Sequence, residues 1–286
     1  TMVYNEDYLL EQGLTPLAQI EDEFSWDVWL DYAMKCTQRE GEDTIMWGTM
    51  STSYIEYGAG CMAISNGGRF FSEDRSKCMF TEPESVEAWK LCTDMVLEYK
   101  VSPPAQVLAA ENEISMFHTG RIAMMSLGNG FWEGLNEELK DFTYDMAIQP
   151  RAPRTNESKC YSNIVSLCVN KDTAAKDQAA AFVQFTITRR AVDIWSHNQL
   201  GVPVRPDAGE FFYDPEVFGP KNRIAALRMF ENIEPLPCLD YVTWGEFITV
   251  FRQWEVEMFE GRVGVEEALG SAAAEIDAMI DKAKPA

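Results

Sequence analysis

One segment, residues 113–132, constrains the fold of this chain more than any other. Residues 113–119 have the composition of a helix end, and Gly120 can adopt the left-handed conformation that closes a helix. Residues 122–125 form a continuous apolar run, typical of a strand buried on both faces. A turn containing two glycines then leads to Trp132. Because open α/β folds bind ligands just past the carboxyl ends of their strands, the segment predicts an α/β fold with a ligand site near Trp132.

The length and the charge of the chain limit its class and its partners. At 286 residues the chain is long enough for two lobes, because single cores stop growing near this size. It has 46 Asp and Glu against 24 Lys and Arg, a formal net charge of -22. Nucleic acids and anionic membranes need clustered basic residues, so both are disfavoured as partners. The acid excess indicates a dispersed, solvated surface, with recruitment of a polyamine or a metal cation as the alternative.

Cysteine and histidine usage indicates neither a disulfide framework nor a metal site. The seven cysteines form no C-x-x-C pair and show no zinc-type spacing, so we expect mostly buried free thiols. His118 and His197 are too far apart in sequence for a local metal motif. The sequence has no apolar run near the roughly 20 residues that span a bilayer, and it opens without a secretory signal. Residues 1–5 resemble the middle of a strand, which predicts that the sequence begins inside a fold.

Helices dominate the predicted elements, and a few short strands lie far apart in the sequence. The pattern predicts helices over 26–37, 84–99, 176–188, 222–232, 244–259 and 264–282, and buried strands over 122–125, 144–148 and 163–170. This arrangement favours α/β lobes whose sheets are completed by distant segments. Crossings between two lobes are expected at 161–164 and at 234–238.

Motifs of the common enzyme classes are missing from the sequence. It has no phosphate-binding loop, no zinc-protease motif, no serine-hydrolase elbow and no calcium loop. Residues 128–130 carry too few glycines for a dinucleotide fingerprint. Acidic pairs such as Glu133 and Glu137 share one helix face, where solvation is the default interpretation. We therefore predict a binding protein rather than an enzyme, with no cofactor and no metal.

Aromatic residues at turns and helix starts are the main candidates for ligand binding. They are Tyr54, Tyr57, Trp132, Trp195 and Trp244. Any one of them could simply pack in a core, but Trp132 and Trp244 each follow a loop at a helix start. Flat aromatic faces beside planar polar groups suit a small-molecule site, and a sugar, with an apolar face and a rim of hydroxyls, matches them well.

Seven short motifs, spread over nearly the whole chain, resemble a known family in the family's order. They are Tyr4-Asn5-Glu6-Asp7 (family YNKD), Ser25-Trp26-Asp27 (TWDE), Asn66-Gly67-Gly68 (DGG or NGG), Phe80-Thr81-Glu82-Pro83-Glu84 (F-x-D-P-E), Phe117 to Met124 with Gly128 to Trp132 (F-x-x-G-K-A-A-M and G-x-W), Gly201-Val202-Pro203-Val204-Arg205 (G-x-I-P-V-R) and Gly261 to Leu269 (G-x-x-S-V-E-E-A-L). The chain is thereby identified as resembling the extracellular solute-binding proteins of ABC importers, in the branch that contains maltose-binding protein.

The resemblance implies a two-lobed, hinged α/β fold of the periplasmic-binding-protein type that closes on a ligand and delivers it to a membrane permease. By position, Trp132 corresponds to the tryptophan that stacks on the sugar, and Tyr57 falls near the stacking tyrosine. Trp244 and Arg252 lie on a late helix that faces the cleft. The remaining predicted ligand-binding residues are Tyr54, Glu56 and Asn129.

The resemblance also implies how the lobes divide the chain. Residues 4–162 and 240–286 are expected to form a complete second lobe, and residues 163–239 the remaining part of the first lobe. Hinge crossings are expected near 161–164 and 234–239. The family's signal peptide and first half-lobe have no counterpart before residue 4, which predicts an N-terminal truncation, a remnant segment with exposed apolar surface, and weak sugar affinity. For the full-length parent, the resemblance implies an extracytoplasmic location, as a periplasmic protein or a cell-surface lipoprotein.

Two alternatives stay open at this point. A non-sugar solute such as a polyamine would favour acidic groups at the cleft, for which Glu56 and Asp240 are the candidates. A carbohydrate-active enzyme would need two acids held at a fixed separation across a sugar ring.

Overall fold

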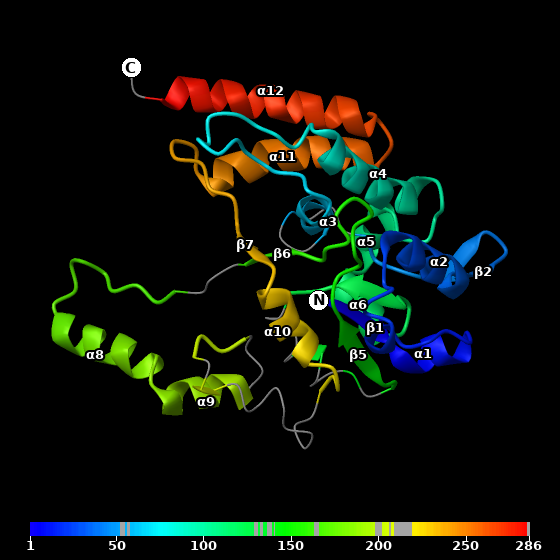
Figure 1. Ribbon diagram of the computed structural model, residues 1–286, viewed down its shortest axis with the longest axis horizontal. Coiled ribbons are helices and arrows are strands. Elements are labelled where there is room, and N and C mark those ends of the chain that lie inside the picture. The colour runs from blue at the N-terminus through cyan, green and yellow to red at the C-terminus, as the bar shows by residue number, and fades with distance from the viewer. Residues whose placement is uncertain are drawn as a thin grey trace.

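The computed structural model describes residues 1–51, 55, 58–128, 131, 134–135, 139, 141–162, 166–197, 202–205, 207–208 and 219–284. Helices supply most of its regular structure (Figure 1). The helices are α1 (Glu6–Glu11), α2 (Trp26–Cys36), α3 (Ala59–Ser65), α4 (Pro83–Leu97), α5 (Ala105–Ala110), α6 (Glu113–His118), α8 (Lys176–Thr186), α9 (Arg189–His197), α10 (Ile224–Phe230), α11 (Trp244–Phe259) and α12 (Val265–Ala283), with a 3₁₀ turn η1 (Leu17–Gln19). The strands are β1 (Met2–Asn5), β2 (Gln38–Glu40), β3 (Asp43–Met46), β4 (Met124–Ser126), β5 (Tyr144–Ala147), β6 (Cys160–Ser162) and β7 (Ile233–Pro235).

The central sheet has the strand order β4-β1-β5, and β1 runs antiparallel to both neighbours. Every residue of the three strands is buried, which explains their continuous apolar runs. Residues 47–50 extend this sheet on the far side of β4. They run parallel to β4 through the bridges Trp47↔Ile122 and Met50↔Met125. The sheet is therefore mixed, with one parallel pair at its edge.

The segment that leads into β4 folds as predicted. Asn112 accepts a hydrogen bond from the Ser115 amide at 3.0 Å and begins α6. Gly120 has a φ of 69°, and the amide of Arg121 returns to the Met116 carbonyl at 2.8 Å, so the helix stops and the chain reverses. The apolar run that follows is fully buried. The predicted helix end, glycine stop and buried strand are confirmed.

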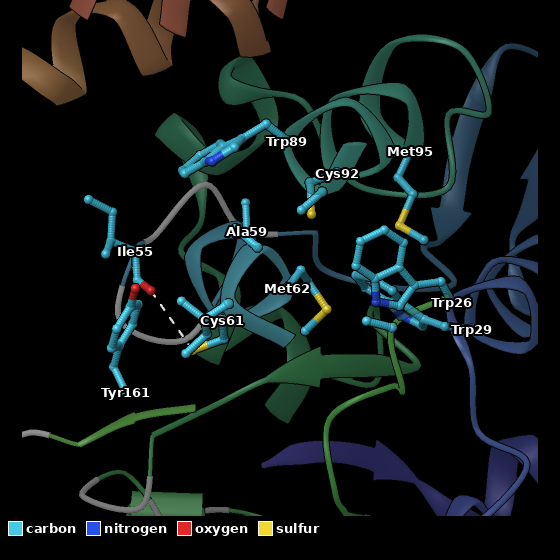
Figure 2. Close-up of a cluster of buried hydrophobic side chains, with 14 of the residues drawn as sticks. Trp26, Trp29, Ile55, Ala59, Cys61, Met62, Trp89, Cys92, Met95 and Tyr161 are labelled. Atoms are coloured by element: carbon cyan, nitrogen blue, oxygen red, sulfur yellow. Dashed lines mark hydrogen bonds between the residues drawn. The ribbon is translucent and has the colours of Figure 1, made fainter. Parts of the chain in front are cut away.

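A second layer of helices covers one end of the molecule. In Figure 1, α11 and α12 lie along each other above α4, and α3 lies beneath them. Their shared core is rich in aromatic rings: Phe251 of α11 lies 5.2 Å, between centroids, from both Phe80 and Trp89. Figure 2 shows Trp89, Cys92 and other side chains of this core around α3. The cluster joins residues 70–89 to the C-terminal helices, so segments far apart in the sequence share this core.

Two crossings lie side by side below this layer. β6 and β7 pair in parallel, with Tyr161 opposite Glu234. Beyond them, α10 packs on β5: the Asn222 amide donates to Asp145 at 2.8 Å, and Met229 is buried in the same cluster as β5. The lobe boundaries stay a prediction, and the contact places residues 222–229 against the sheet.

The segment from residue 166 to 197 departs from the prediction. Its described part begins with residues 166–170, which are exposed and have no strand, so the buried strand predicted over 163–170 is wrong for these residues. The physical reason is that a buried strand needs neighbours for its backbone groups and its faces. Helix α8 forms as predicted but has no buried residue among those described, and Figure 1 shows α8 and α9 to one side of the sheet.

Apolar side chains on this segment face solvent. They are Leu167, Val169, Phe182, Phe185, Ile187, Ile194 and Trp195. The expectation of exposed apolar surface on this segment is confirmed.

All seven cysteines are free thiols: four are buried, Cys160 is half-buried, and Cys168 and Cys238 are exposed. Most of the thiols are therefore buried, as predicted, and the three exceptions are Cys160, Cys168 and Cys238. Within the described part of the chain, none of the helices is long and apolar enough to cross a membrane.

Candidate functional site

Two strands of the central sheet end at the same edge, and each is followed in the sequence by predicted ligand-binding residues. The residues 47–50 and β4 run parallel, and the Met50 amide donates to the Met124 carbonyl at 2.8 Å. Their carboxyl ends therefore meet at one edge, where open α/β sheets bind ligands. One strand leads into residues 52–57 and the other into residues 129–132. These are the two segments that carry most of the predicted ligand-binding residues.

Five predicted residues lie outside the described part of the chain. They are Tyr54, Glu56, Tyr57, Asn129 and Trp132. The strand ends from which they follow are described, so the structure fixes where both segments begin.

Hydrogen bonds hold both strand ends in place. The Ser51 amide donates to Ser102 Oγ at 2.9 Å, and Ser51 Oγ donates to the Cys92 carbonyl at 2.9 Å. On the second strand, Gln149 Nε2 donates to Ser126 Oγ. All of these residues are buried, so the strand ends before residues 52–57 and 129–132 are held rigidly.

Residue Ile55, which the structure describes between residues 52–54 and 56–57, belongs to the core. Its side chain is fully buried in the core cluster, and its carbonyl accepts a hydrogen bond from Cys61 Sγ at 3.9 Å (Figure 2). Sequence reasoning missed Ile55, because one isoleucine between polar and aromatic residues carries no periodic signal.

Residue Trp244 begins α11, as predicted. Thr243 caps the helix: its hydroxyl accepts from the Glu246 amide at 3.3 Å, and its own amide donates to Glu246 Oε2 at 2.9 Å. The Trp244 ring is half-buried and lies 5.1 Å from the Phe247 ring. Part of this tryptophan therefore packs on the core, and part is accessible.

The other two predicted polar residues lie near the same helix. Arg252 is exposed on α11. Asp240, the candidate acid for a polyamine, pairs with Arg75 at 3.0 Å between exposed side chains. The Arg75 guanidinium of the same chain therefore already pairs with this carboxylate.

Two of the hollows in the described part of the molecule have no predicted ligand-binding residue in their lining. The larger, of about 560 Å³, is lined by Glu42, Asp43, Thr44, Ile45, Trp47, Val107 and Arg121. Trp47 and Arg121 stand at the amino ends of the two parallel strands. This hollow therefore lies at the sheet edge opposite the strand ends that lead into residues 52–57 and 129–132.

The smaller hollow, of about 270 Å³, contains a buried carboxylate. Glu21 is 7% exposed and accepts hydrogen bonds from the Ile148 amide at 3.3 Å and from Asn222 Nδ2 at 2.7 Å. Its second oxygen pairs with Arg228. Glu21 thus ties an N-terminal loop to β5 and to the α10 segment, a role that its polar sequence context did not reveal.

Burial also perturbs an acid beside this network. The pKa of Asp145 is raised by desolvation, and the amides of Asn222 and Met146, which donate to it, oppose the shift. No group of three or more His, Cys, Asp or Glu in the described ranges could hold a metal ion. In the described part of the chain, Glu21 and Asp145 therefore connect separate segments through hydrogen bonds.

Comparisons with known proteins identify a family and a fold. The sequence profile of the family described as bacterial extracellular solute-binding protein matches residues 1–219.

Solved structures match nearly all of the chain. An ABC substrate-binding protein from Listeria monocytogenes in complex with cycloalternan superposes with a TM-score of 0.83 at 20% identity, over 98% of this chain and 69% of that one. An ABC transporter solute-binding protein from Thermotoga lettingae bound with α-D-tagatose gives 0.78 at 19% identity, over 98% and 69%. Maltose-bound MalE3 of T. maritima gives 0.75 at 19% identity, over 97% and 70%. At these identities the likeness shows the fold, and the predicted two-lobed solute-binding fold is confirmed.

Proposed function

Because the chain belongs to the bacterial extracellular solute-binding proteins, we propose that it is the substrate-binding component of an ABC importer and that its solute is a carbohydrate. The observation that carries the proposal is that two neighbouring parallel strands end at one edge of the sheet, and that each is followed in the sequence by aromatic residues. The similar structures from Listeria, Thermotoga lettingae and T. maritima hold cycloalternan, tagatose and maltose, which supports a sugar.

The site residues are assigned by chemistry. Trp132 provides the main stacking face for a sugar ring and Tyr57 a second one, since flat aromatic surfaces match the apolar face of a pyranose. Trp244 supplies a further aromatic surface from α11. Hydroxyls of the sugar bind a polar set made of Tyr54, Glu56, Asn129 and Arg252.

The lobes are assigned from the chain crossings. Residues 4–162 and 240–286 form the second lobe, and 163–239 belong to the first, with hinges near 161–164 and 234–239. The parallel pairing of β6 with β7 supports two adjacent crossings. A ligand held between the lobes would shift an equilibrium between open and closed forms.

The proposed role includes delivery to permease subunits in the membrane and an extracytoplasmic location, either periplasmic or as a cell-surface lipoprotein. It includes no reaction, since the family comprises binding proteins. Fractionation of cells that carry the native gene tests the location, and recovery only in the cytosol would contradict it.

A non-sugar solute is the second candidate. UgpB of Mycobacterium tuberculosis, solved in complex with glycerophosphocholine, superposes with a TM-score of 0.76 at 15% identity, over 98% of this chain and 68% of that one. The same fold therefore accepts a non-sugar ligand, and the acid excess of this chain keeps cationic solutes in the comparison.

Calorimetric titration tests the solute. The panel contains monosaccharides, linear and cyclic maltooligosaccharides, glycerophosphocholine and spermidine. We expect saturable heat with at least one sugar, and a Trp132→Ala variant that binds that sugar more than about tenfold more weakly, since central aromatic anchors dominate binding. Phe182→Ala is the control for the loss of an aromatic ring, because Phe182 is 62% exposed on α8 and is not among the predicted ligand-binding residues. Binding of spermidine or glycerophosphocholine without any sugar would overturn the sugar assignment, and turnover of a chromogenic glycoside would overturn the assignment as a binding protein.

A further inference from the structure

The β2–β3 hairpin leaves one edge of β3 without a partner strand. Among the described residues, β3 pairs with β2 and with no other strand, and Figure 1 shows β2 at the margin of the molecule. The stretch of chain after β3 does have a second neighbour: the Trp47 amide donates to the Arg121 carbonyl at 2.9 Å, and Met50 bridges to Met125. The pairing with the β4 side therefore begins only where β3 has ended.

The helix α6 is the reason why this edge stays unpaired. Residues 47–50 run parallel to residues 122–125, so the neighbours of β3 on that side would be the residues before Arg121. Those residues form α6, which closes at Gly120. Because they are helical, they cannot pair with β3 as a strand.

The hollow of about 560 Å³ lies along this edge of β3. Asp43, Thr44 and Ile45 line it in succession, Val107 of α5 and Arg121 also line it, and its described lining contains no residue of β2. Successive side chains of a strand point to opposite faces of its sheet. A hollow that is lined by three successive residues therefore meets the edge of the strand, not one of its faces. Its volume falls within the range of ~300–1,000 Å³ that is typical of ligand pockets.

The charge beside this edge is negative. Glu42 and Asp43 are exposed, and neither has an ion pair within the described ranges. The guanidinium of Arg121 already pairs with Glu111. Ile45, which is 42% exposed, adds an apolar surface. A complementary partner therefore brings positive charge together with some apolar side chains.

We infer that the free edge of β3 is a docking site for an extended, lysine- or arginine-rich segment of another protein, which adds to β3 as a further strand. In this mode of recognition the backbone hydrogen bonds give affinity and alternate side chains give specificity. Basic side chains of the segment pair with Glu42 and Asp43, and apolar ones contact Ile45 and Val107. A second copy of the chain fits less well, because its own β3 brings the same acids to the edge and like charges repel.

Synthetic peptides test the inference with the full chain. The probe is a fluorescein-labelled peptide of six residues that alternates lysine and valine, and fluorescence anisotropy measures its affinity. We expect saturable binding at ~0.15 M salt, where interactions beyond about 8 Å are screened. The fully N-methylated peptide has the same charge but donates no backbone hydrogen bonds, so it should bind at least about tenfold more weakly. Equal affinities would mean a general attraction to an acidic chain and would overturn the inference.

A matched pair of double variants tests the acidic side of the edge. Glu42→Lys with Asp43→Lys reverses the local charge and should weaken binding of the lysine–valine peptide by about tenfold or more. The control is Glu266→Lys with Glu267→Lys, which changes the net charge equally at two exposed acids in the first turn of α12. It should bind the peptide within about twofold of the unaltered chain. Equal losses in the two double variants would contradict a site at β3.

Hydrogen–deuterium exchange and sedimentation locate the added strand and identify its source. A saturating amount of the lysine–valine peptide should slow exchange most over residues 42–46. Slowing confined to residues 38–40 would place the peptide on the outer edge of β2 and overturn the assignment. In sedimentation the chain alone should be a monomer. A dimer that the Glu42→Lys, Asp43→Lys variant abolishes would assign the edge to a second copy and overturn the basic partner.

Discussion

The aromatic core beneath α11 gives the most quantitative prediction. Phe251 is 1% exposed, and its ring lies 5.2 Å from those of Phe80 and Trp89, 5.7 Å from Phe247 and 6.0 Å from Phe70. Truncating a buried phenylalanine to alanine costs about 3–5 kcal/mol of unfolding free energy. Favourable ring pairs add about 0.5–1.5 kcal/mol each beyond burial. With four ring partners, Phe251→Ala should fall at the upper end, about 4–5 kcal/mol.

The same substitution at an exposed site is the control. Phe182 on α8 is 62% exposed, so Phe182→Ala should change the unfolding free energy by about 0.5 kcal/mol or less. Urea titrations followed by far-UV circular dichroism measure both variants against the unaltered chain. Losses within about 1 kcal/mol of each other would refute the reasoning, because they would mean that exposure does not govern the cost. A loss above about 2 kcal/mol for Phe182→Ala would mean that α8 is packed in solution.

Three further predictions concern polar groups. Burial raises the pKa of Asp145 in the folded state, so this group favours folding at low pH and loses that contribution as pH rises through its folded pKa. Asp145→Asn should therefore raise the urea midpoint at pH 7, and the gain should vanish as the pH falls below ~4, where the unfolded group also protonates. Glu21→Ala removes the acceptor that Arg228 and an amide share, and should cost about 1–3 kcal/mol in the same assay; an unchanged midpoint would contradict the tether. Thr243→Ala removes the capping box of α11 and should cost about 1 kcal/mol, whereas Thr249→Ala, on the exposed side of the helix, should cost about 0.5 kcal/mol or less.

Local signals explain what the sequence predicted correctly. Ser25 caps α2 by accepting from the Val28 amide, and Pro83 stands at the first turn of α4, where its missing N–H costs nothing. Gly120 ends α6 in the left-handed conformation. Each signal acts over a few residues, so a single sequence contains all the information it needs.

The strand predicted over residues 166–170 was wrong because it depended on distant parts of the fold and not on local signals. An apolar run indicates that a segment seeks burial, but the covering surface must come from elsewhere in the fold. Helix α8 makes the same point, because its helical pattern was read correctly while Phe182 and Phe185 stay exposed. For α8 the helix was predictable and its exposure was not, whereas over residues 166–170 the strand prediction itself was wrong.

In the same way, the sequence indicated some residues of the candidate site and its surroundings and missed others. The resemblance of short motifs pointed to Trp132 and Tyr57 as ligand residues, and the role of each stays a prediction. No pattern pointed to Glu21, whose acidic loop looks solvated, or to the close approach of Ile55 to Gly60. Contacts between residues distant in sequence, or close approaches that the absence of a side chain allows, appear only when the backbone path is known.

The cysteines of this chain can report how often different parts of the structure open, because some are exposed and others are buried. Cys168 and Cys238 should react with a thiol reagent at once, because both are exposed. Burial raises the pKa of the Cys36 and Cys92 thiols to about 12, so these sites react only when the surrounding structure opens. Cys61 lies next to Ile55 and is equally enclosed. Mass spectrometry of a timed labelling series would therefore report, without any introduced probe, how often each part of the core admits solvent and whether a bound solute slows it.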